Sequence, residues 1–295
     1  MAFDELSRNM GLRPHVALWQ TTRFELDLSS PLVMGIVNVT PDSFSNSNFN
    51  VSAVDAIAHA EALVEAGANI LDIGGESTRP GAQALSSNEE WERIAPVLLQ
   101  VLKWHVPVSV DTYHPQTMRK ALDLGVDIVN DVWALRQPGA LDIVSSGKCG
   151  LCIMHMHGEP ATMNLHPMTG PVMDGLRVFF QKQLSLIEEK GIDSNRVVID
   201  PGIGFGKSVS QNFEILRNQS ELLSLGRPLM AGWSNKSSLG TVSGLAVDQR
   251  LVPSVVAAIM AAERGAKILR VHAVAETIAA LSVWKAGTGI CDNLS

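Results

Sequence analysis

Short hydrophobic stretches alternate with longer amphipathic segments along most of this chain. The stretches are rich in Val, Ile, Leu and Met and have the length of strands that are covered on both faces. The segments between them carry apolar residues at helical spacing. The pattern predicts strands at Val33–Val39, Ile70–Gly74, Val106–Asp111, Ile128–Val132, Leu151–Met156, Val197–Asp200, Pro228–Gly232 and Ile268–Val271. It predicts helices at Val54–Ala66, Glu89–Trp104, Pro115–Leu124, Val172–Lys190, Phe213–Leu223 and Val247–Arg264.

One local pattern recurs with a different final residue each time. Residues 65–72, 123–130 and 263–270 read EAGANILD, DLGVDIVN and ERGAKILR. Each copy is typical of a helix that ends at Gly and leads into a buried strand. Because the unit repeats while its last residue changes from Asp to Asn to Arg, we interpret the unit as scaffold and the polar residue as chemistry.

The alternation of strands and helices predicts an α/β fold, a (β/α)8 TIM barrel of one domain. The 295 residues, of which 46% are hydrophobic, can bury one large core of this kind. A doubly wound open sheet is the alternative, but no G-x-G-x-x-G motif opens a helix after the first strand. Residues 1–30 are expected to form an N-terminal extension or barrel cap, residues 31–286 the barrel, and residues 287–295 a C-terminal tail.

Charge and cysteine content narrow the class of partner. The formal net charge of −7 argues against broad binding to nucleic acid or to anionic membranes, so an anionic substrate would need a local basic pocket. The sequence contains neither a secretion signal nor an apolar run of membrane length. Cys149, Cys152 and Cys291 are too few for a disulfide framework. These features predict a cytoplasmic protein whose partners are small molecules.

Polar or charged side chains follow almost every predicted strand. They include Asn38, Asp72, Glu76, Arg79, Asp111, Asn130, Asp131, His155, His157, Asp200, Asn235, Lys236, Arg270 and His272. In a barrel these strand ends meet on one face, where the active sites of this fold are found. A single carboxylate at such a position is as readily a cap for the following helix. Polar residues at nearly all the strand ends favour a binding site.

The residue types suggest what that face binds. Asp111, Asn130 and Asp200 offer acceptors and donors to a flat heterocycle with ring N–H and carbonyl groups. The cations Arg79, Lys207, Lys236 and Arg270, with His272, suit a polyanion such as pyrophosphate. The glycine-rich segment DPGIGFGK at residues 200–207 lets backbone approach a ligand, although such a segment alone is as typical of a turn.

Several motifs together resemble one enzyme family. They are NVTPDSFS at residues 38–45, DIGGESTRPG at 72–81, SVDT at 109–112, ND at 130–131, MHM at 154–156, DPGIGFGK at 200–207, KS at 236–237 and RVH at 270–272. In this order they resemble the dihydropteroate synthases. The resemblance implies a TIM barrel, usually a homodimer, that condenses 6-hydroxymethyl-7,8-dihydropterin diphosphate with 4-aminobenzoate. The implied products are 7,8-dihydropteroate and pyrophosphate, the implied cofactor is Mg²⁺, and sulfonamides are the implied inhibitors.

The resemblance also implies a role for each matching residue. It places the pterin against Asp111, Asn130, Met154, Asp200 and Lys236. It places the diphosphate at Asn38, Thr78, Arg270 and His272, with Mg²⁺ held by the phosphates and Asn38. It places aminobenzoate at Phe44, Arg79, Pro80, Phe205 and Ser237. Asp111, Asp200, Lys236 and Arg270 are the implied catalytic residues. The implied mechanism is dissociative: the diphosphate leaves first, and the amine then attacks a cation delocalised into the pterin.

The chain departs from the family pattern in three places. Asn46–Asn50 replaces the usual Asp-Gly-Gly, Asn235 replaces an arginine beside Lys236, and Ala273 replaces an aspartate beside His272. These departures keep open a divergent, catalytically weak paralogue that binds pterin. A pterin-dependent methyltransferase is a further alternative, although it has no use for the Ser-Thr-Arg-Pro motif.

Two other spacings have competing interpretations. Cys149 and Cys152 have C-x-x-C spacing but lead into a buried strand, so a packing pair at the closed end of the barrel is favoured over a redox pair. His155 and His157 have a spacing found in barrel hydrolases that bind zinc. No clear further ligands accompany them, so a zinc site is disfavoured.

Overall fold

A closed barrel of parallel strands forms the centre of the computed structural model, which describes residues 18–40, 49–76, 85–158, 163 and 167–289. The barrel strands are β3 (Leu32–Asn38), β4 (Ile70–Gly74), β5 (Val108–Asp111), β6 (Ile128–Asp131), β7 (Gly150–Met154), β8 (Val197–Asp200), β9 (Leu229–Ala231) and β10 (Ala266–Val271). Each pairs with the next in parallel register, and β10 closes the barrel against β3. This confirms the predicted (β/α)8 fold.

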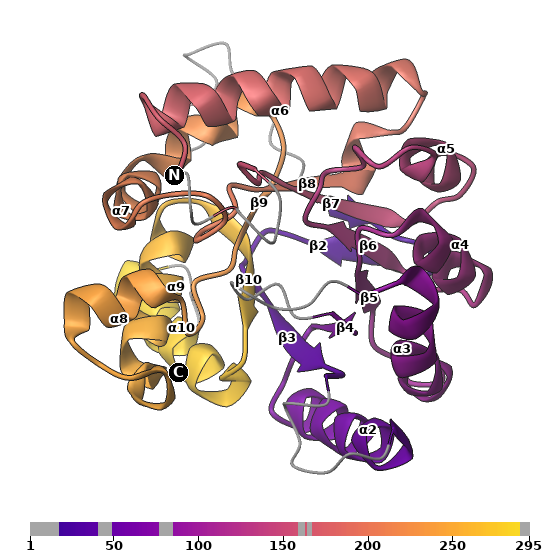
Figure 1. The fold of residues 1–295 in the computed structure, drawn as a ribbon. Helices are drawn as coiled ribbons and strands as arrows, with labels where there is room; N and C mark the ends of the chain where they lie inside the picture. Colours follow the sequence, from indigo (N-terminus) through magenta and orange to yellow (C-terminus); the bar gives the residue numbers. More distant parts are fainter. Residues whose placement is uncertain (1–17, 41–48, 77–84, 159–162, 164–166, 290–295) are drawn as a thin grey trace.

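Helices surround the barrel and cover its outer face (Figure 1). They are α2 (Phe49–Glu65), α3 (Ser87–Val101), α4 (Pro115–Asp123), α5 (Ala140–Ser145), α6 (Val172–Glu189), α7 (Val209–Asn218), α8 (Ser237–Ser243), α9 (Leu251–Glu263) and α10 (Val274–Thr288). Short 3-10 turns lie at Ser194–Arg196, Gln219–Leu225 and Val247–Gln249. Among the described helices, none is long and apolar enough to cross a membrane.

Most of the core has two parts, because alternate residues of each strand point to opposite faces, and a third cluster includes Met154 and Phe205. The larger part lies between strands and helices and contains residues such as Val37, Ile73 and Ile199. The smaller part fills the lower half of the barrel interior. It contains Met34, Ile70, Ile128, Cys152, Val198, Met230 and Ile268, and we refer to it as the barrel floor.

A small hairpin that the strand pattern did not predict seals the floor from below. Its strands are β1 (Leu18–Gln20) and β2 (Glu25–Asp27). Trp19 is fully buried in the floor cluster, and its indole Nε1 donates to the backbone oxygen of Arg196 at 2.9 Å. Such a three-residue strand has no hydrophobic run to predict it, so only the packing of Trp19 and Leu28 identifies its place.

Several helices also differ from the prediction. The predicted segment Phe213–Leu223 is the end of α7 followed by a 3-10 turn, and α5, α8 and α10 were not predicted. Helix α10 runs to Thr288, two residues into the segment expected to be a tail. Cys149 and Cys152 are buried and free, and burial raises the pKa of both thiols, which fits the packing interpretation.

Candidate active site

The side chains of the upper barrel interior follow the floor residues at a spacing of two. The pairs are Ile70 and Asp72 on β4, Ile128 and Asn130 on β6, Cys152 and Met154 on β7, Val198 and Asp200 on β8, and Ile268 and Arg270 on β10. Strand periodicity turns the second member of each pair to the same side as the first. The same pattern that builds an apolar floor therefore places polar groups above it.

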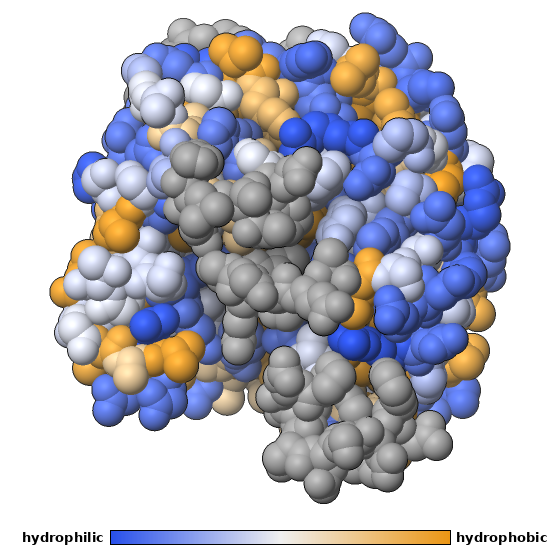
Figure 2. All heavy atoms as spheres, viewed as in Figure 1, coloured by the Kyte–Doolittle hydropathy of each residue, from blue (hydrophilic) through white to orange (hydrophobic). Residues whose placement is uncertain are grey.

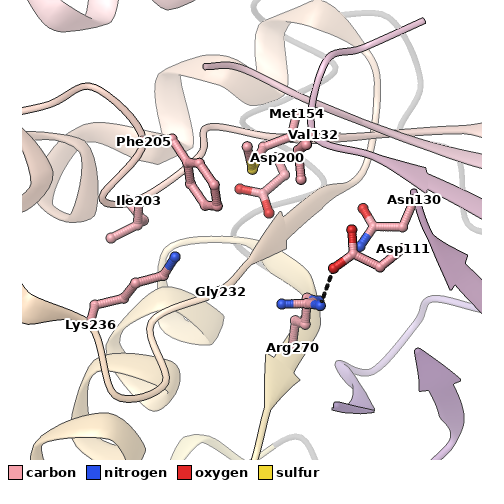
Figure 3. A pocket seen from close by; sticks show the side chains of 10 residues that line it. All are labelled: Asp111, Asn130, Val132, Met154, Asp200, Ile203, Phe205, Gly232, Lys236 and Arg270. Atoms are coloured by element: carbon pink, nitrogen blue, oxygen red, sulfur yellow. Dashed lines mark hydrogen bonds and ion pairs between the residues drawn. The ribbon is translucent and has the colours of Figure 1, made fainter. Parts of the chain in front are cut away.

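These groups line a pocket with about 360 Å³ of empty space at the carboxyl ends of the strands. Figure 3 shows the lining residues, which are Asp111, Asn130, Val132, Met154, Asp200, Ile203, Phe205, Gly232, Lys236 and Arg270. Seven of the predicted site residues thus meet in one place: Asp111, Asn130, Met154, Asp200, Phe205, Lys236 and Arg270. Carboxylates lie on β5 and β8, and the cations come from β10 and the segment after β9.

Arg270 holds two carboxylates together on one wall of this pocket. Its Nε lies 2.6 Å from Asp72 Oδ2, and its Nη2 lies 2.6 Å from Asp111 Oδ2. Asn130 Nδ2 donates to the same Asp72 oxygen at 3.1 Å. Because the amide nitrogen of Asn130 is engaged there, its Oδ1 is left as the acceptor that faces the pocket. Asp72 thereby fixes the orientation of two site residues, a role that the sequence did not reveal.

Burial shifts the proton affinities of the site carboxylates. It raises the pKa of Asp111 to about 7, although the Arg270 guanidinium opposes this shift. Burial also raises the pKa of Asp200, against the hydrogen bond that the Gly202 amide donates to it at 2.7 Å. Two buried carboxyl groups therefore face the pocket with pKa values above their ordinary range, as is common for groups that bind or react.

An aromatic ring and a lysine form the opposite wall. Phe205 is buried, and Lys236 Nζ lies 4.3 Å from the centroid of its ring. Burial lowers the pKa of Lys236 to about 8, and Arg270 contributes to this shift. A cation beside a ring face is attracted by the π electrons, so the lysine stem and the ring stay together. They leave a flat apolar surface next to a charged donor.

The remaining predicted site residues fall into two groups. Phe44, Thr78, Arg79 and Pro80 lie outside the described residues, as does most of the unusual Asn46–Asn50 stretch. Asn38, Ser237 and His272 are described and stand at the ends of β3, at the start of α8 and after β10, but they do not line the pocket. Each lies at or after the carboxyl end of its strand, β3, β9 or β10, which is the end of the barrel that holds the pocket.

The structure accommodates two of the sequence departures. Asn235 has a left-handed backbone (φ 58°), a conformation that asparagine tolerates. Its backbone N–H donates to Ser254 Oγ at 3.0 Å. His272 has Ala273 where the family has a carboxylate, and its Nδ1 lies 2.9 Å from Ser234 Oγ. The Ser234 hydroxyl therefore lies within hydrogen-bonding distance of the imidazole.

The structure contradicts the prediction for Lys207 and describes the surroundings of His155 and His157. The prediction that Lys207 faces a polyanion is wrong, because its ammonium is buried and donates to three backbone carbonyls. His155 is buried against the edge of Phe179, and burial lowers its pKa to about 2, while His157 is exposed. Within the described ranges, no group of three or more His, Cys, Asp or Glu side chains could hold a metal ion.

Together, the barrel and its pocket define a class: (β/α)8 enzymes that bind a flat, nitrogen-rich ring between buried carboxylates and cations. Residues 34–272 match the family model described as pterin binding enzyme. The dihydropteroate synthase of Neisseria meningitidis serogroup B is 45% identical over 276 residues, covering 91% of this chain and 97% of that one. The chain belongs to the pterin-binding enzyme family, and within it to the dihydropteroate synthases.

Solved structures agree with this assignment. The Burkholderia cenocepacia dihydropteroate synthase complexed with 7,8-dihydropteroate is 44% identical and has a TM-score of 0.84, covering 93% of this chain and 97% of that one. The Yersinia pestis dihydropteroate synthase in a sulfonamide drug complex is 38% identical and has a TM-score of 0.87, covering 92% of this chain and 99% of that one.

Proposed function

We propose that this chain condenses 6-hydroxymethyl-7,8-dihydropterin diphosphate with 4-aminobenzoate to give 7,8-dihydropteroate and pyrophosphate. The observation that carries this proposal is the pocket in which Asp111, Asn130 and Asp200 face Lys236 and Arg270. Relatives bearing the family name and a relative complexed with the product support it.

The pterin half of the site is assigned to Asp111, Asn130, Met154, Asp200 and Lys236. An ionised carboxylate accepts two N–H bonds from an amidine-like ring edge, which orients the ring as well as binding it. Met154 is buried beside these groups and offers a polarizable apolar contact to a ring face. As the C–O bond to diphosphate breaks, positive charge develops in the ring, and the carboxylates stabilise it.

The diphosphate is assigned to Asn38, Thr78, Arg270 and His272 at the mouth. Arg270 lines the pocket and contacts Asp111, so its guanidinium adjoins the pterin half of the site. Mg²⁺ would be held by diphosphate oxygens and the amide oxygen of Asn38, which suits an ion that takes few protein ligands and several phosphate oxygens. Bound there, the metal would neutralise charge on the leaving group.

Aminobenzoate is assigned to Phe205 and Ser237, with Phe44, Arg79 and Pro80. Phe205 and the Lys236 stem provide the flat surface on which a benzene ring can lie. The amine would then attack the carbon from which diphosphate departs, so the reaction requires no nucleophile from the protein.

Measuring pyrophosphate release with and without aminobenzoate tests the proposal. Release that depends on both substrates and yields dihydropteroate is the expected result. A protein that binds hydroxymethylpterin but releases no pyrophosphate would be the catalytically weak paralogue instead.

We further propose a homodimer that forms through an apolar surface on α8 and α9. Exposed side chains gather there, namely Val242 (60% exposed), Val247 (52%), Leu251 (43%), Val252 (69%) and Val256 (51%). Figure 2 shows hydrophobic atoms at the lower left, over the position of α8 in Figure 1. A patch of this kind is typical of a protein interface. Light scattering should give a dimer mass for the wild type and a monomer mass for Val252→Glu; a monomeric wild type would refute the dimer.

A cytoplasmic location belongs to the same proposal. The buried free thiols of Cys149 and Cys152 agree with a reducing compartment.

A further inference from the structure

Lys207 lies in the loop that joins β8 to α7, and its ammonium group is buried beneath that loop. Its Nζ donates to the backbone oxygens of His155 at 3.2 Å, Gly202 at 2.8 Å and Phe205 at 3.1 Å. Two of these oxygens belong to the loop itself, and the third belongs to the segment after β7. One side chain thus joins the loops that follow two neighbouring strands.

The chemistry of the group fits this role. An ammonium has three N–H donors and no acceptor, and each carbonyl oxygen only accepts. Three carbonyls therefore saturate the buried cation, which would otherwise carry a large desolvation penalty. A guanidinium is planar and larger, so arginine would not present three donors to the same three oxygens.

Glycine allows the loop to come this close. Gly202 and Gly206 both have left-handed backbone, with φ of 69° and 68°. A Cβ at Gly202 would collide with the backbone oxygen of His155, and a Cβ at Gly206 would collide with that of His157. The loop is therefore pressed against the backbone after β7, and Lys207 holds it there from below.

The held segment carries one wall of the pocket. Lys207 binds the backbone oxygens of Gly202 and Phe205, and Ile203 lies between these two residues in the chain. The side chains of Ile203 and Phe205 both line the pocket. Asn212 supports the loop from the other side, since its Oδ1 accepts from the Gly204 amide at 2.9 Å. Asp200 is the last residue of β8 and also contacts this region, since its backbone oxygen accepts from the His155 N–H at 2.9 Å and its Oδ1 accepts from the Gly202 N–H at 2.7 Å.

We propose that Lys207 is a positioning residue for the second substrate: its ammonium sets the place of the Phe205 ring on which the aminobenzoate ring lies. The inference rests on the proposed function, because that function assigns Phe205 to aminobenzoate. Two of the groups assigned to the pterin, Asp111 and Asn130, lie on β5 and β6, outside the segments that Lys207 joins, so pterin binding should depend less on Lys207 than aminobenzoate binding does.

Lys207→Met tests this, because methionine keeps the length of the side chain and removes all three donors. The KM for aminobenzoate should rise about tenfold, the effect of losing roughly 1.4 kcal/mol of positioning hydrogen bonds. The KM for the pterin diphosphate and kcat should change by less than about twofold. Lys182→Met, which changes an exposed lysine of α6, is the matched control and should alter neither constant.

A merely structural role would give a different result. It would lower kcat through a smaller folded fraction and leave both KM values unchanged, and that outcome would overturn the inference. If circular dichroism shows that Lys207→Met does not fold, Lys207→Gln, which keeps two N–H donors, should give a smaller rise in the aminobenzoate KM; an unchanged KM would again refute it. A wild-type protein that releases no pyrophosphate would instead refute the proposed function.

Discussion

Replacing Asp111 with asparagine separates the charge of the pterin-binding carboxylate from its shape. Asp111 Oδ2 lies 2.6 Å from Arg270 Nη2. Asparagine can keep one acceptor oxygen, but it presents an N–H₂ group where the ring edge also donates. A mispaired buried group costs about 1–3 kcal/mol, which is roughly 5- to 150-fold in affinity. In the wild type, the pterin must displace Arg270 from the Asp111 carboxylate, which offsets part of the free energy of pterin binding. We therefore expect Asp111→Asn to lower the pterin affinity about tenfold.

The pH dependence should change in the same variant. Burial raises the pKa of Asp111 to about 7, with Arg270 opposing the shift, and the ionised form is the one that accepts two N–H bonds. Wild-type affinity should therefore rise with pH through about 7, and be lost as the pH falls below it, because the carboxyl group then takes up a proton. The Asp111→Asn protein has no carboxyl group at this position that titrates near pH 7. Lys236 titrates in both proteins: burial lowers its pKa to about 8, and because Asp111 opposes that shift, the step should move to lower pH in Asp111→Asn.

Calorimetry with unreactive 6-hydroxymethylpterin between pH 6 and 8 measures both effects. Asp123→Asn, at an exposed carboxylate that ends α4, is the matched control and should bind as the wild type does. Equal affinity of the Asp111→Asn and wild-type proteins at pH 8, or parallel pH profiles, would show that the ring does not bind at this carboxylate.

Three further outcomes follow from the same structure. Asp72→Asn should raise the KM for the pterin diphosphate about tenfold, since it removes the negative charge to which Arg270 and Asn130 both donate and so weakens both contacts; an unchanged KM would exclude the orienting role. Trp19→Ala should lower the free energy of unfolding by about 3–5 kcal/mol in urea titrations while leaving both KM values alone, and a stability equal to wild type would contradict its place in the floor. A sulfonamide should compete with aminobenzoate, and Phe205→Leu should weaken both by about 2- to 12-fold; noncompetitive inhibition would place the drug elsewhere.

The sequence predicted the barrel well because fully covered strands leave a strong local signal. Runs such as Val197–Asp200 and Ile70–Gly74 match their strands to the residue. The pocket residues could be named because each follows such a run. Helix α10 also had a signal, an alanine-rich segment with Glu276 in its first turn, and could have been predicted.

What the sequence did not reveal depends on contacts between distant segments. The position of Trp19 depends on the hydrogen bond from its indole to the backbone oxygen of Arg196, 177 positions away in the chain. Asp72 could be recognised as a strand-end carboxylate, but its two partners come from β6 and β10. Lys207 was grouped with the cations that suit a polyanion, and only the backbone path of its loop shows three carbonyls around it.

The spacing of two between floor and pocket residues restricts how this enzyme can evolve. Deleting one residue within β8 would turn Ile199 inward and move Asp200 toward the helices, so the pocket would lose a carboxylate and the outer core would gain a buried charge in a single event. Insertions and deletions are therefore confined to the loops. Changes in the strands must come by substitution, one side chain at a time, and those in the upper half can alter substrate or drug recognition while the lower half keeps the molecule folded.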